Sequence, residues 1–209
     1  MTTRRGWLIA ALAAAACSRG KAPGADALPA GATVLALGDS ITAGVGAPAE
    51  ASYPTQLAAA TGWNVINGGV SGDTSAQALQ RLPALLAEHR PALVIVSIGG
   101  NDFLRRVGAD ETEANLRRIV ATAREAQSQV LLVAVPQPSL TAAAGLGLSD
   151  HPLFARLAAE LKLPLHAQGW SRVLGDEKLK SDPIHANAAG YRVFADELVQ
   201  TLRTTGLLK

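Results

Sequence analysis

The 209-residue sequence contains a single cysteine, Cys17, and this scarcity limits its chemistry. One cysteine excludes an intrachain disulfide and any metal site built from several thiolates. Charge of one sign is also scarce, because 19 basic residues face 17 acidic ones and the net charge is +2. So small an excess provides no electrostatic surface for the phosphates of a nucleic acid. The sequence therefore predicts no nucleic-acid partner and no thiolate metal centre.

The N-terminal apolar run is too short to cross a bilayer. It covers residues 7–16, whereas a transmembrane helix needs about 20 apolar residues. Arg4 and Arg5 precede the run and small residues follow it, which is the pattern of a secretory signal. We therefore predict an export signal over residues 1–16. The paired arginines fit a twin-arginine signal, and a general export signal is the alternative.

Cys17 follows a run of alanines and precedes Ser18, which resembles the site where bacterial lipoproteins are cleaved and lipidated. Ala14 departs from that pattern, because leucine usually stands three residues before the cysteine. Lipidation of Cys17 would tether the protein to a membrane, and plain cleavage after the alanines is the alternative. Cleavage before Cys17 removes two arginines and no acid, which balances the remaining charges. The expected location is the periplasm, as a membrane-anchored lipoprotein.

A flexible tether and one folded domain are expected after the signal. Residues 17–32 contain the lipid attachment site and then a stretch rich in glycine, alanine and proline without apolar periodicity. Residues 33–209 are long enough to bury a sizeable core in one domain. We expect this domain to be a monomer.

Within the domain, short apolar runs alternate with segments of helical period. The runs predicted as strands are 33–37, 64–67, 93–98, 130–135 and 163–167. Runs such as ALVIVSI and VLLVAV show little polar alternation, as in strands covered on both faces. Strand and helix alternate about five times, which predicts an α/β fold. We expect a three-layer α/β/α sandwich of the flavodoxin-like type with about five parallel strands.

Local signals mark three of the expected helices. Asp110 and Glu113 predict a capping box at the start of a helix with an apolar stripe. Asn187 predicts the N-cap of the final helix. The segment QALQRLPALLAEHR contains Pro83, which removes a backbone donor and clashes with the preceding turn. We therefore expect a break at Pro83 rather than one straight helix.

Polar, glycine-rich blocks follow the first three predicted strands. They are GDS at 38–40, NGGVSGDTS at 67–75 and GGND at 99–102, and a further block, SDPIHANAAGY at 181–191, precedes the final helix. Ligands bind at the carboxyl ends of the strands in doubly wound sheets, so the first three blocks share a ligand-binding edge. Alone, GDS indicates an ordinary turn. Four such blocks in order indicate a functional site.

In sequence and order these blocks resemble the SGNH hydrolases, also called GDSL esterases and lipases, over residues 33–203. Within that family, SGDTS, RLPALL and GGND are most similar to the bacterial thioesterase I, lysophospholipase L1 and arylesterase group. The resemblance implies a serine hydrolase of carboxylic esters or thioesters that works without a cofactor or a metal. Small-molecule or lipid esters are the implied substrates.

The residue types agree with this chemistry. Ser40 becomes a nucleophile when a base takes its proton, and the imidazole of His185 is a suitable base. Asp182, three residues before His185, is placed to orient the ring, and the resemblance assigns the same triad roles. The expected oxyanion donors are the backbone N–H groups of Ser40 and Gly72 and the side-chain amide of Asn101.

The other titratable residues have weaker signals. His89, His151 and His166 are expected to be structural or solvated, because no cysteine or carboxylate cluster stands at metal-ligand spacing. Asp39 and Asp73 are expected to support their loops by local hydrogen bonds.

Substrate and function leave alternatives open. Leu140, Leu146 and Leu148 follow the fourth predicted strand and are candidates either for an acyl pocket or for an ordinary loop. A carbohydrate O-deacetylase of the same fold would prefer acetyl groups on sugars. A non-catalytic binding lipoprotein is a further alternative, but it gives no reason for the serine, the acid and the histidine to occur together.

Overall fold

The computed structural model describes residues 26–137 and 147–209. The predicted export signal (1–16) and Cys17 lie outside these residues, as do Leu140 and Leu146 of the predicted acyl pocket. Within the described part, no helix combines the length and the hydropathy needed to cross a bilayer.

Five parallel strands form one sheet in the order β2-β1-β3-β4-β5. They are β1 (Thr33–Gly38), β2 (Asn64–Gly69), β3 (Leu93–Ser97), β4 (Gln129–Val133) and β5 (Leu165–His166). The chain passes from β1 to one side and then crosses to the other, as in flavodoxin-like sheets. The predicted α/β fold is therefore confirmed, although β2 is longer and β5 shorter than expected.

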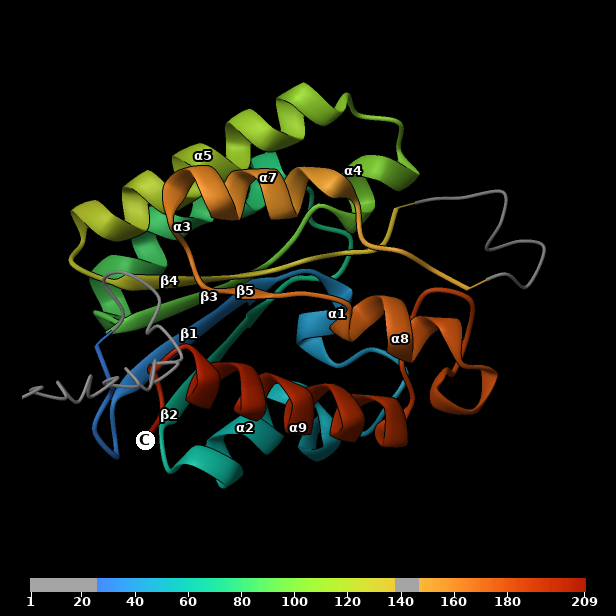
Figure 1. Cartoon of the computed structure of the whole chain (residues 1–209), viewed down its shortest axis with the longest axis horizontal. Coiled ribbons are helices and arrows are strands. Elements are labelled where there is room, and N and C mark those ends of the chain that lie inside the picture. Colours follow the sequence, from blue (N-terminus) through green and yellow to red (C-terminus); the bar gives the residue numbers. More distant parts are fainter. Residues whose placement is uncertain (1–25, 138–146) are drawn as a thin grey trace, which may run out of the picture.

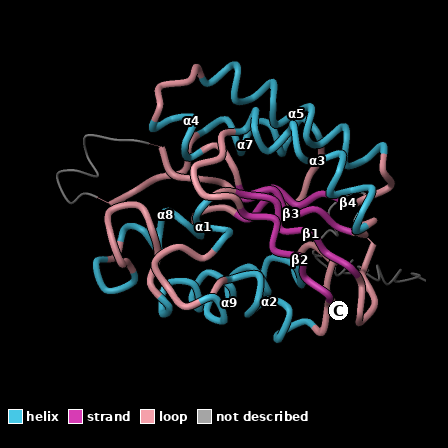
Figure 2. The backbone as a smooth tube through the Cα atoms, turned by 180° about the vertical axis from the view of Figure 1, so that it is seen from behind, coloured by secondary structure: helices cyan, strands magenta, loops and turns pink. Residues whose placement is uncertain are grey.

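Helices cover both faces of the sheet and give three layers (Figure 1). One face carries α3 (Ser75–His89), α5 (Ala109–Glu125) and α7 (Pro152–Leu161), and the other carries α2 (Tyr53–Thr61) and α9 (Ala188–Thr204). Figure 2 shows the same layers from behind, with the strands between them. Three short helices lie toward the carboxyl ends of the strands: α1 (Ser40–Ala43), α4 (Gly100–Leu104) and α8 (Gly169–Gly175).

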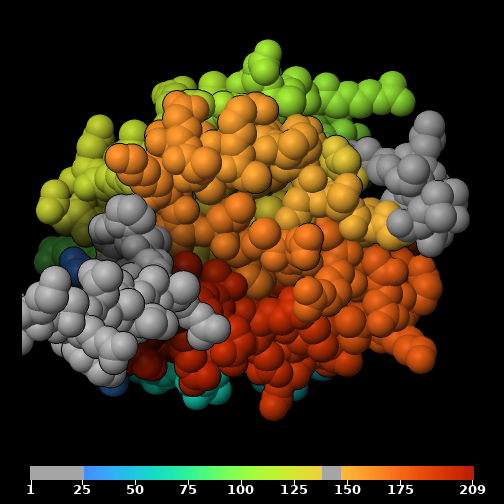
Figure 3. Space-filling view, in the orientation of Figure 1, coloured from blue at the N-terminus to red at the C-terminus, as the bar shows by residue number. Residues whose placement is uncertain are grey.

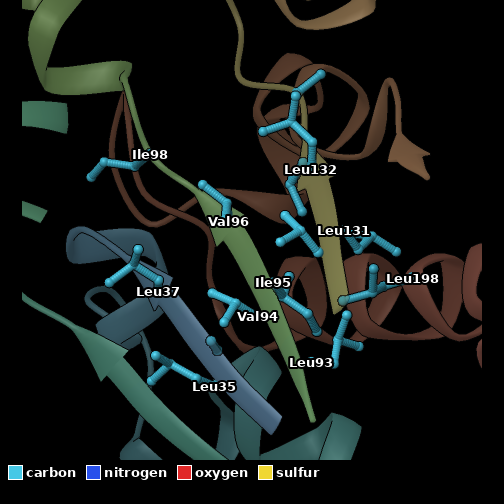
Figure 4. Packing of buried hydrophobic residues seen from close by; sticks show 14 of the residues in the cluster. Leu35, Leu37, Leu93, Val94, Ile95, Val96, Ile98, Leu131, Leu132 and Leu198 are labelled. Carbon is cyan, nitrogen blue, oxygen red and sulfur yellow. The ribbon is translucent and has the colours of Figure 1, made fainter. Parts of the chain in front are cut away.

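The strands contribute apolar side chains to both faces of the sheet (Figure 4). Every residue of β3 is buried, which explains why its sequence LVIVS lacks polar alternation. Leu198 of α9 packs beside this core in Figure 4. The apolar stripe predicted for α5 is buried and consists of Leu116, Ile119, Val120 and Ala123. On α9 the buried side chains include Tyr191, Phe194, Leu198 and Leu202.

Helix α3 differs from its prediction, because it continues through Pro83 from residue 75 to residue 89. The expected break is wrong. Proline costs the helix one backbone hydrogen bond. A capping box between Thr74 and Gln77 secures the first turn, and Leu82 beside the proline is fully buried. Capping and tertiary packing thus outweigh the local penalty.

The capping box predicted at Asp110 is also wrong. The N-cap of α5 is Gly108, so Asp110 lies in the first helical turn, where its charge still favours the helix dipole. Glu113 instead pairs with Arg117 at 2.7 Å and with Arg156. Hydrogen bonds from these two arginines lower the pKa of Glu113.

The folded part begins earlier than predicted. The N–H of Leu28 donates to the carbonyl of Leu207 at 2.9 Å, and Leu28 is buried. The side-chain amide of Gln129 bonds both the N–H and the carbonyl of Asp26, each at 2.8 Å. Residues 26–32, assigned to the tether from sequence, therefore pack where the strands begin.

Helices α7, α8 and α9 make up most of the face shown in Figure 3. In the interior, the buried ring of Trp170 on α8 stacks on that of Phe194 on α9, with ring centroids 3.6 Å apart. Tyr53 of α2 meets both rings edge-on. Trp170 Nε1 also donates to the hydroxyl of Ser97 at the end of β3, 3.0 Å away. This buried cluster fixes α8 and α9 beneath the carboxyl edge of the sheet.

The three histidines outside the predicted site occupy structural positions. His89 ends α3. His151 caps α7, where its Nδ1 accepts the N–H of Leu153 at 3.3 Å. His166 is buried at the end of β5.

His166 is expected to make the fold sensitive to acid. Its Nδ1 lies 2.7 Å from the hydroxyl of Thr201, and no described residue partners its buried Nε2. Burial, assisted by the charge of Arg172, lowers the pKa of His166 to about 4. Between pH 6.5 and pH 4 the unfolded chain binds a proton that the folded protein does not, so acid favours unfolding.

The difference between the pKa of His166 in the unfolded chain and in the folded protein lowers the free energy of unfolding by about 3 kcal/mol as the pH falls from 7 to 4. The variant His166→Asn keeps a polar group near Thr201 and does not titrate. In urea unfolding, the free energy of unfolding of the variant relative to that of wild type should therefore rise by about 3 kcal/mol as the pH falls from 7 to 4. Other titrating groups cancel, because both proteins contain them. A difference that stays constant with pH would contradict the prediction.

Candidate active site

Ser40 follows the carboxyl end of β1 and opens α1. Between them, Asp39 caps α1 by accepting the N–H of Ile41 at 3.1 Å. A Cβ on Gly38, the last residue of β1, would collide with the side chain of Thr42 on α1 and with the carbonyl oxygen of Ser97 on β3. Glycine therefore allows α1 to fold closely over the strand ends. This turn presents the Ser40 hydroxyl at the edge of the sheet.

The imidazole of His185 lies between Ser40 and Asp182. Its Nε2 is 2.9 Å from the Ser40 Oγ, and its Nδ1 is 2.7 Å from the Asp182 Oδ2. The serine and the histidine are 145 positions apart in the chain. The structure thus brings together the serine, the base and the acid that the sequence analysis singled out.

A tight loop before α9 presents Asp182 and His185 together. The Oδ1 of Asp182 accepts the N–H groups of Ile184 and His185, each at 2.9 Å, which leaves Oδ2 for the imidazole. Asn187 follows and accepts the N–H of Gly190 at 3.0 Å, so the predicted N-cap of α9 is confirmed. The cap ties the loop to a buried helix.

The surroundings of Asp182 favour its ionised form. Partial desolvation raises its pKa, but the hydrogen bond and charge of His185, with the N–H of Ile184, outweigh this and hold the pKa below its usual range. A carboxylate beside Nδ1 favours the imidazole tautomer that carries its proton there. Nε2 is then free to accept the proton of the Ser40 hydroxyl.

Gly72 lies in the loop after β2, and Asn101 lies in α4, the short helix that follows β3. Gly72 has a φ of +82°, and no described residue accepts its N–H. Asn101 Nδ2 donates to the carbonyl of Asp73 at 3.0 Å and lies 3.4 Å from the Asp39 Oδ2, a long and weak contact. Asn101 lines the same cavity as Ser40, whereas Gly72 does not contribute to its wall.

Asp39 supports its loop as expected, but its environment is unusual. The side chain is buried between Ser40 and Asn101 in the fold, with its Oδ2 facing the Asn101 amide. Burial raises the pKa of Asp39 to about 6, although the Ile41 N–H and the charge of His185 oppose this. A titratable carboxyl therefore adjoins the proposed reacting groups without bonding the serine hydroxyl.

Two arginines that the sequence analysis missed join these loops. Arg81 of α3 pairs with Asp73 at 2.7 Å and donates to the carbonyl of Gly38 at 2.8 Å. Arg105, at the end of α4, donates to the carbonyl of Gly72 at 2.8 Å. A signal for Arg105 was present, because it stands four residues after the asparagine of GGND, on the same helix face. Arg81 offered no comparable signal.

A cavity of about 140 Å³ opens beside Ser40. Asn101 shares its polar end, and most of the remaining wall is apolar. The aliphatic side chains along it belong to Ile41, Leu104, Val135, Leu148, Leu174 and Ile184. Of the three leucines predicted for an acyl pocket, Leu148 lines the cavity, and the other two lie outside the described residues.

The site combines a hydroxyl hydrogen-bonded to a base, a carboxylate that orients the base, nearby N–H donors and an apolar cavity. These are the parts needed for nucleophilic attack on a carbonyl carbon. Among the described residues, no three histidine, cysteine, aspartate or glutamate side chains gather as metal ligands.

Comparison with known proteins identifies relatives of this chain. Residues 36–193 match the profile of the GDSL-like Lipase/Acylhydrolase family. The chain is 36% identical over 180 residues to Thioesterase 1/protease 1/lysophospholipase L1 of Escherichia coli (strain K12), covering 82% of this chain and 83% of that protein.

Two solved structures are similar in fold. The crystal structure of TesA gives a TM-score of 0.73 at 32% identity, over 83% of this chain and 99% of that one. The psychrotrophic esterase EstA from Pseudoalteromonas sp., inhibited by monoethylphosphonate, gives 0.71 at 25% identity, over 82% and 96% of the two chains.

Proposed function

Because the chain belongs to the GDSL-like lipase/acylhydrolase family, we propose that it hydrolyses carboxylic esters or thioesters through Ser40, His185 and Asp182. The observation that carries this proposal is the pair of hydrogen bonds from Ser40 through His185 to Asp182, at 2.9 and 2.7 Å. These bonds lie beside an apolar cavity that can receive an acyl group.

The proposed reaction has two halves. In the first, the Ser40 Oγ attacks the carbonyl carbon while His185 Nε2 takes the hydroxyl proton. The tetrahedral intermediate collapses, the protonated imidazole gives its proton to the departing alcohol or thiol, and the acyl group remains on Ser40. In the second, His185 takes a proton from water as the water attacks this acyl-enzyme. The carboxylic acid leaves, and Ser40 regains its proton.

Asp182 and three N–H donors stabilise the charges that form. The Asp182 carboxylate offsets the positive charge on His185. The N–H of Ser40 is the first donor of α1 and has no acceptor within that helix. In the proposed complex, it donates to the carbonyl oxygen of the ester together with the Gly72 N–H and the Asn101 amide. Loss of one such donor typically lowers turnover about 10²- to 10³-fold.

The size of the cavity sets how much of an acyl chain it can bury. Its volume is about 140 Å³, and an apolar cavity of roughly 150 Å³ holds a benzene molecule. An acyl group of about six carbons therefore fits. Each methylene moved from water into such a site contributes about 0.8 kcal/mol, or roughly fourfold. We expect kcat/KM for nitrophenyl esters to rise from two carbons to about six and to stop rising beyond.

A matched pair of variants tests this expectation. Leu148→Phe narrows the cavity and should shift the optimum to shorter chains. Leu161→Phe makes the same change at the end of α7, away from the cavity lining, and should leave the profile unchanged. Highest activity on the acetyl ester, with no response to Leu148→Phe, would contradict the assignment and favour the carbohydrate deacetylase. The mainly aliphatic cavity wall argues against that alternative.

We also propose that the protein is exported and lipidated at Cys17. The support is the sequence of residues 1–17 alone. Mass analysis of the mature amino terminus tests both steps, because lipidation predicts a modified cysteine as its first residue, and plain cleavage predicts no added lipid mass.

A further inference from the structure

Gly72 occupies the third position of a hydrogen-bonded turn, residues 70–73. The N–H of Asp73 donates to the carbonyl of Val70 at 3.1 Å. The φ of Gly72 is +82°, whereas Ser71 has no positive φ, which identifies a type II turn. The central peptide points in opposite directions in type I and type II turns. Glycine at this position therefore sets the direction of the Gly72 N–H.

Direction alone does not place this N–H relative to Ser40. Two further side chains hold the turn in space, one in α4 and one at the C-cap of α4. Arg105 Nη2 donates to the carbonyl of Gly72 at 2.8 Å. Asn101 Nδ2 donates to the next carbonyl, that of Asp73, at 3.0 Å. The backbone N–H of Arg105 in turn bonds the carbonyl of Asn101 at 3.0 Å. One short helix thus holds two consecutive carbonyls of the turn.

Folding stability gives little reason for this use of Arg105. The residue is exposed, and exposed charged contacts contribute little to the free energy of unfolding. Its guanidinium nevertheless lies close enough that a Cβ on Gly72 would stand 3.4 Å from Nη2. The adjacent Arg106 is equally exposed, and within the described residues its side chain bonds none of this turn. Contact with the turn is therefore what distinguishes the two arginines.

We propose that Arg105 is a positioning residue: it holds the Gly72 turn against α4, so that the Gly72 N–H and the Asn101 amide keep a fixed separation. The inference rests on the function proposed above. As negative charge forms on the substrate carbonyl oxygen, both donors must already be in place, because reorienting them then costs free energy. Arg105 acts through the turn, and the turn acts on the oxyanion.

Removal of Arg105 should affect the chemical step more than substrate binding. Arg105→Ala is expected to lower kcat about 10- to 100-fold while KM changes by about twofold or less. Arg105→Lys keeps one donor and should retain most of the activity. Added guanidinium at millimolar concentration should partly restore kcat in Arg105→Ala. Arg106→Ala removes the same charge from the neighbouring position and should keep the wild-type kcat. All the variants should share one thermal midpoint.

The outcomes separate this inference from the proposed function. If wild type hydrolyses esters through Ser40 and the kcat of Arg105→Ala equals that of Arg106→Ala, the positioning role is overturned and the proposed function stands. If Arg105→Ala loses activity together with thermal stability, and neither guanidinium nor lysine restores kcat, Arg105 has only a structural role. A wild-type protein without Ser40-dependent turnover overturns both.

Discussion

Ser40→Ala is expected to lower ester hydrolysis by about a millionfold. Without the hydroxyl, no group at the end of β1 can form the acyl-enzyme, and His185 has no proton to take. The remaining N–H donors could polarise a bound ester, but that effect alone leaves a small residual rate. The rate of nitrophenol release by purified wild type and variant measures the effect.

A second serine controls for losses caused by the substitution itself. Ser128 lies just before β4, at the opposite end of the sheet, where its hydroxyl donates to the carbonyl of Pro91 at 2.6 Å. Ser128→Ala should cost about 1 kcal/mol of stability and leave turnover unchanged. If Ser40→Ala folds normally and keeps more than about one hundredth of wild-type turnover, Ser40 is not the nucleophile.

Asp182→Asn is expected to lower kcat about 10³- to 10⁴-fold. The asparagine oxygen can still accept the N–H groups of Ile184 and His185, so the loop should keep its shape. Its NH₂ group, however, donates toward Nδ1, which favours the tautomer with the proton on Nε2. Such an imidazole cannot accept the serine proton. The carboxylate is 43% exposed, so water replaces part of its effect, which places the loss below that for Ser40→Ala.

Two measurements isolate the role of the Asp182 charge. Nitrogen NMR of the imidazole should show the proton on Nδ1 in wild type and on Nε2 in Asp182→Asn. Asp176→Asn is the matched control, because Asp176 accepts the N–H of Lys178 at 2.9 Å in a similar local cap outside the site. That variant should retain wild-type kcat. An unchanged kcat in Asp182→Asn would contradict the proposed role of this acid.

Much of the site was predictable from sequence because its parts are local. Ser40 follows directly after a buried strand, and Asp182 stands three residues before His185, so strand pattern and spacing locate both. Parallel strands bring their carboxyl ends to one edge, which explains how residues 145 positions apart meet. The alternation of strand and helix likewise predicted the parallel α/β sheet.

The failed predictions depended on tertiary contacts. Pro83 predicts a break when only its own turn is considered, yet α3 is held by its cap and by buried leucines on both sides. Asp110 and Glu113 fit a capping box, but arginines from α5 and α7 engage the glutamate instead. Similarly, the wall of the cavity comes from separate loops and from α1, α4 and α8, and no local pattern connects them.

The measurement that tests the central claim most directly is covalent trapping of the nucleophile. The purified protein would be incubated with a nitrophenyl alkylphosphonate, whose phosphorus accepts a serine oxygen as nitrophenol leaves. Intact mass and peptide mapping would then locate the adduct. We predict one adduct per chain, on Ser40, parallel loss of ester hydrolysis, and no adduct in Ser40→Ala. An adduct on another residue that accompanies loss of activity would contradict the account. So would a Ser40→Ala variant that reacts with the phosphonate as fast as wild type does.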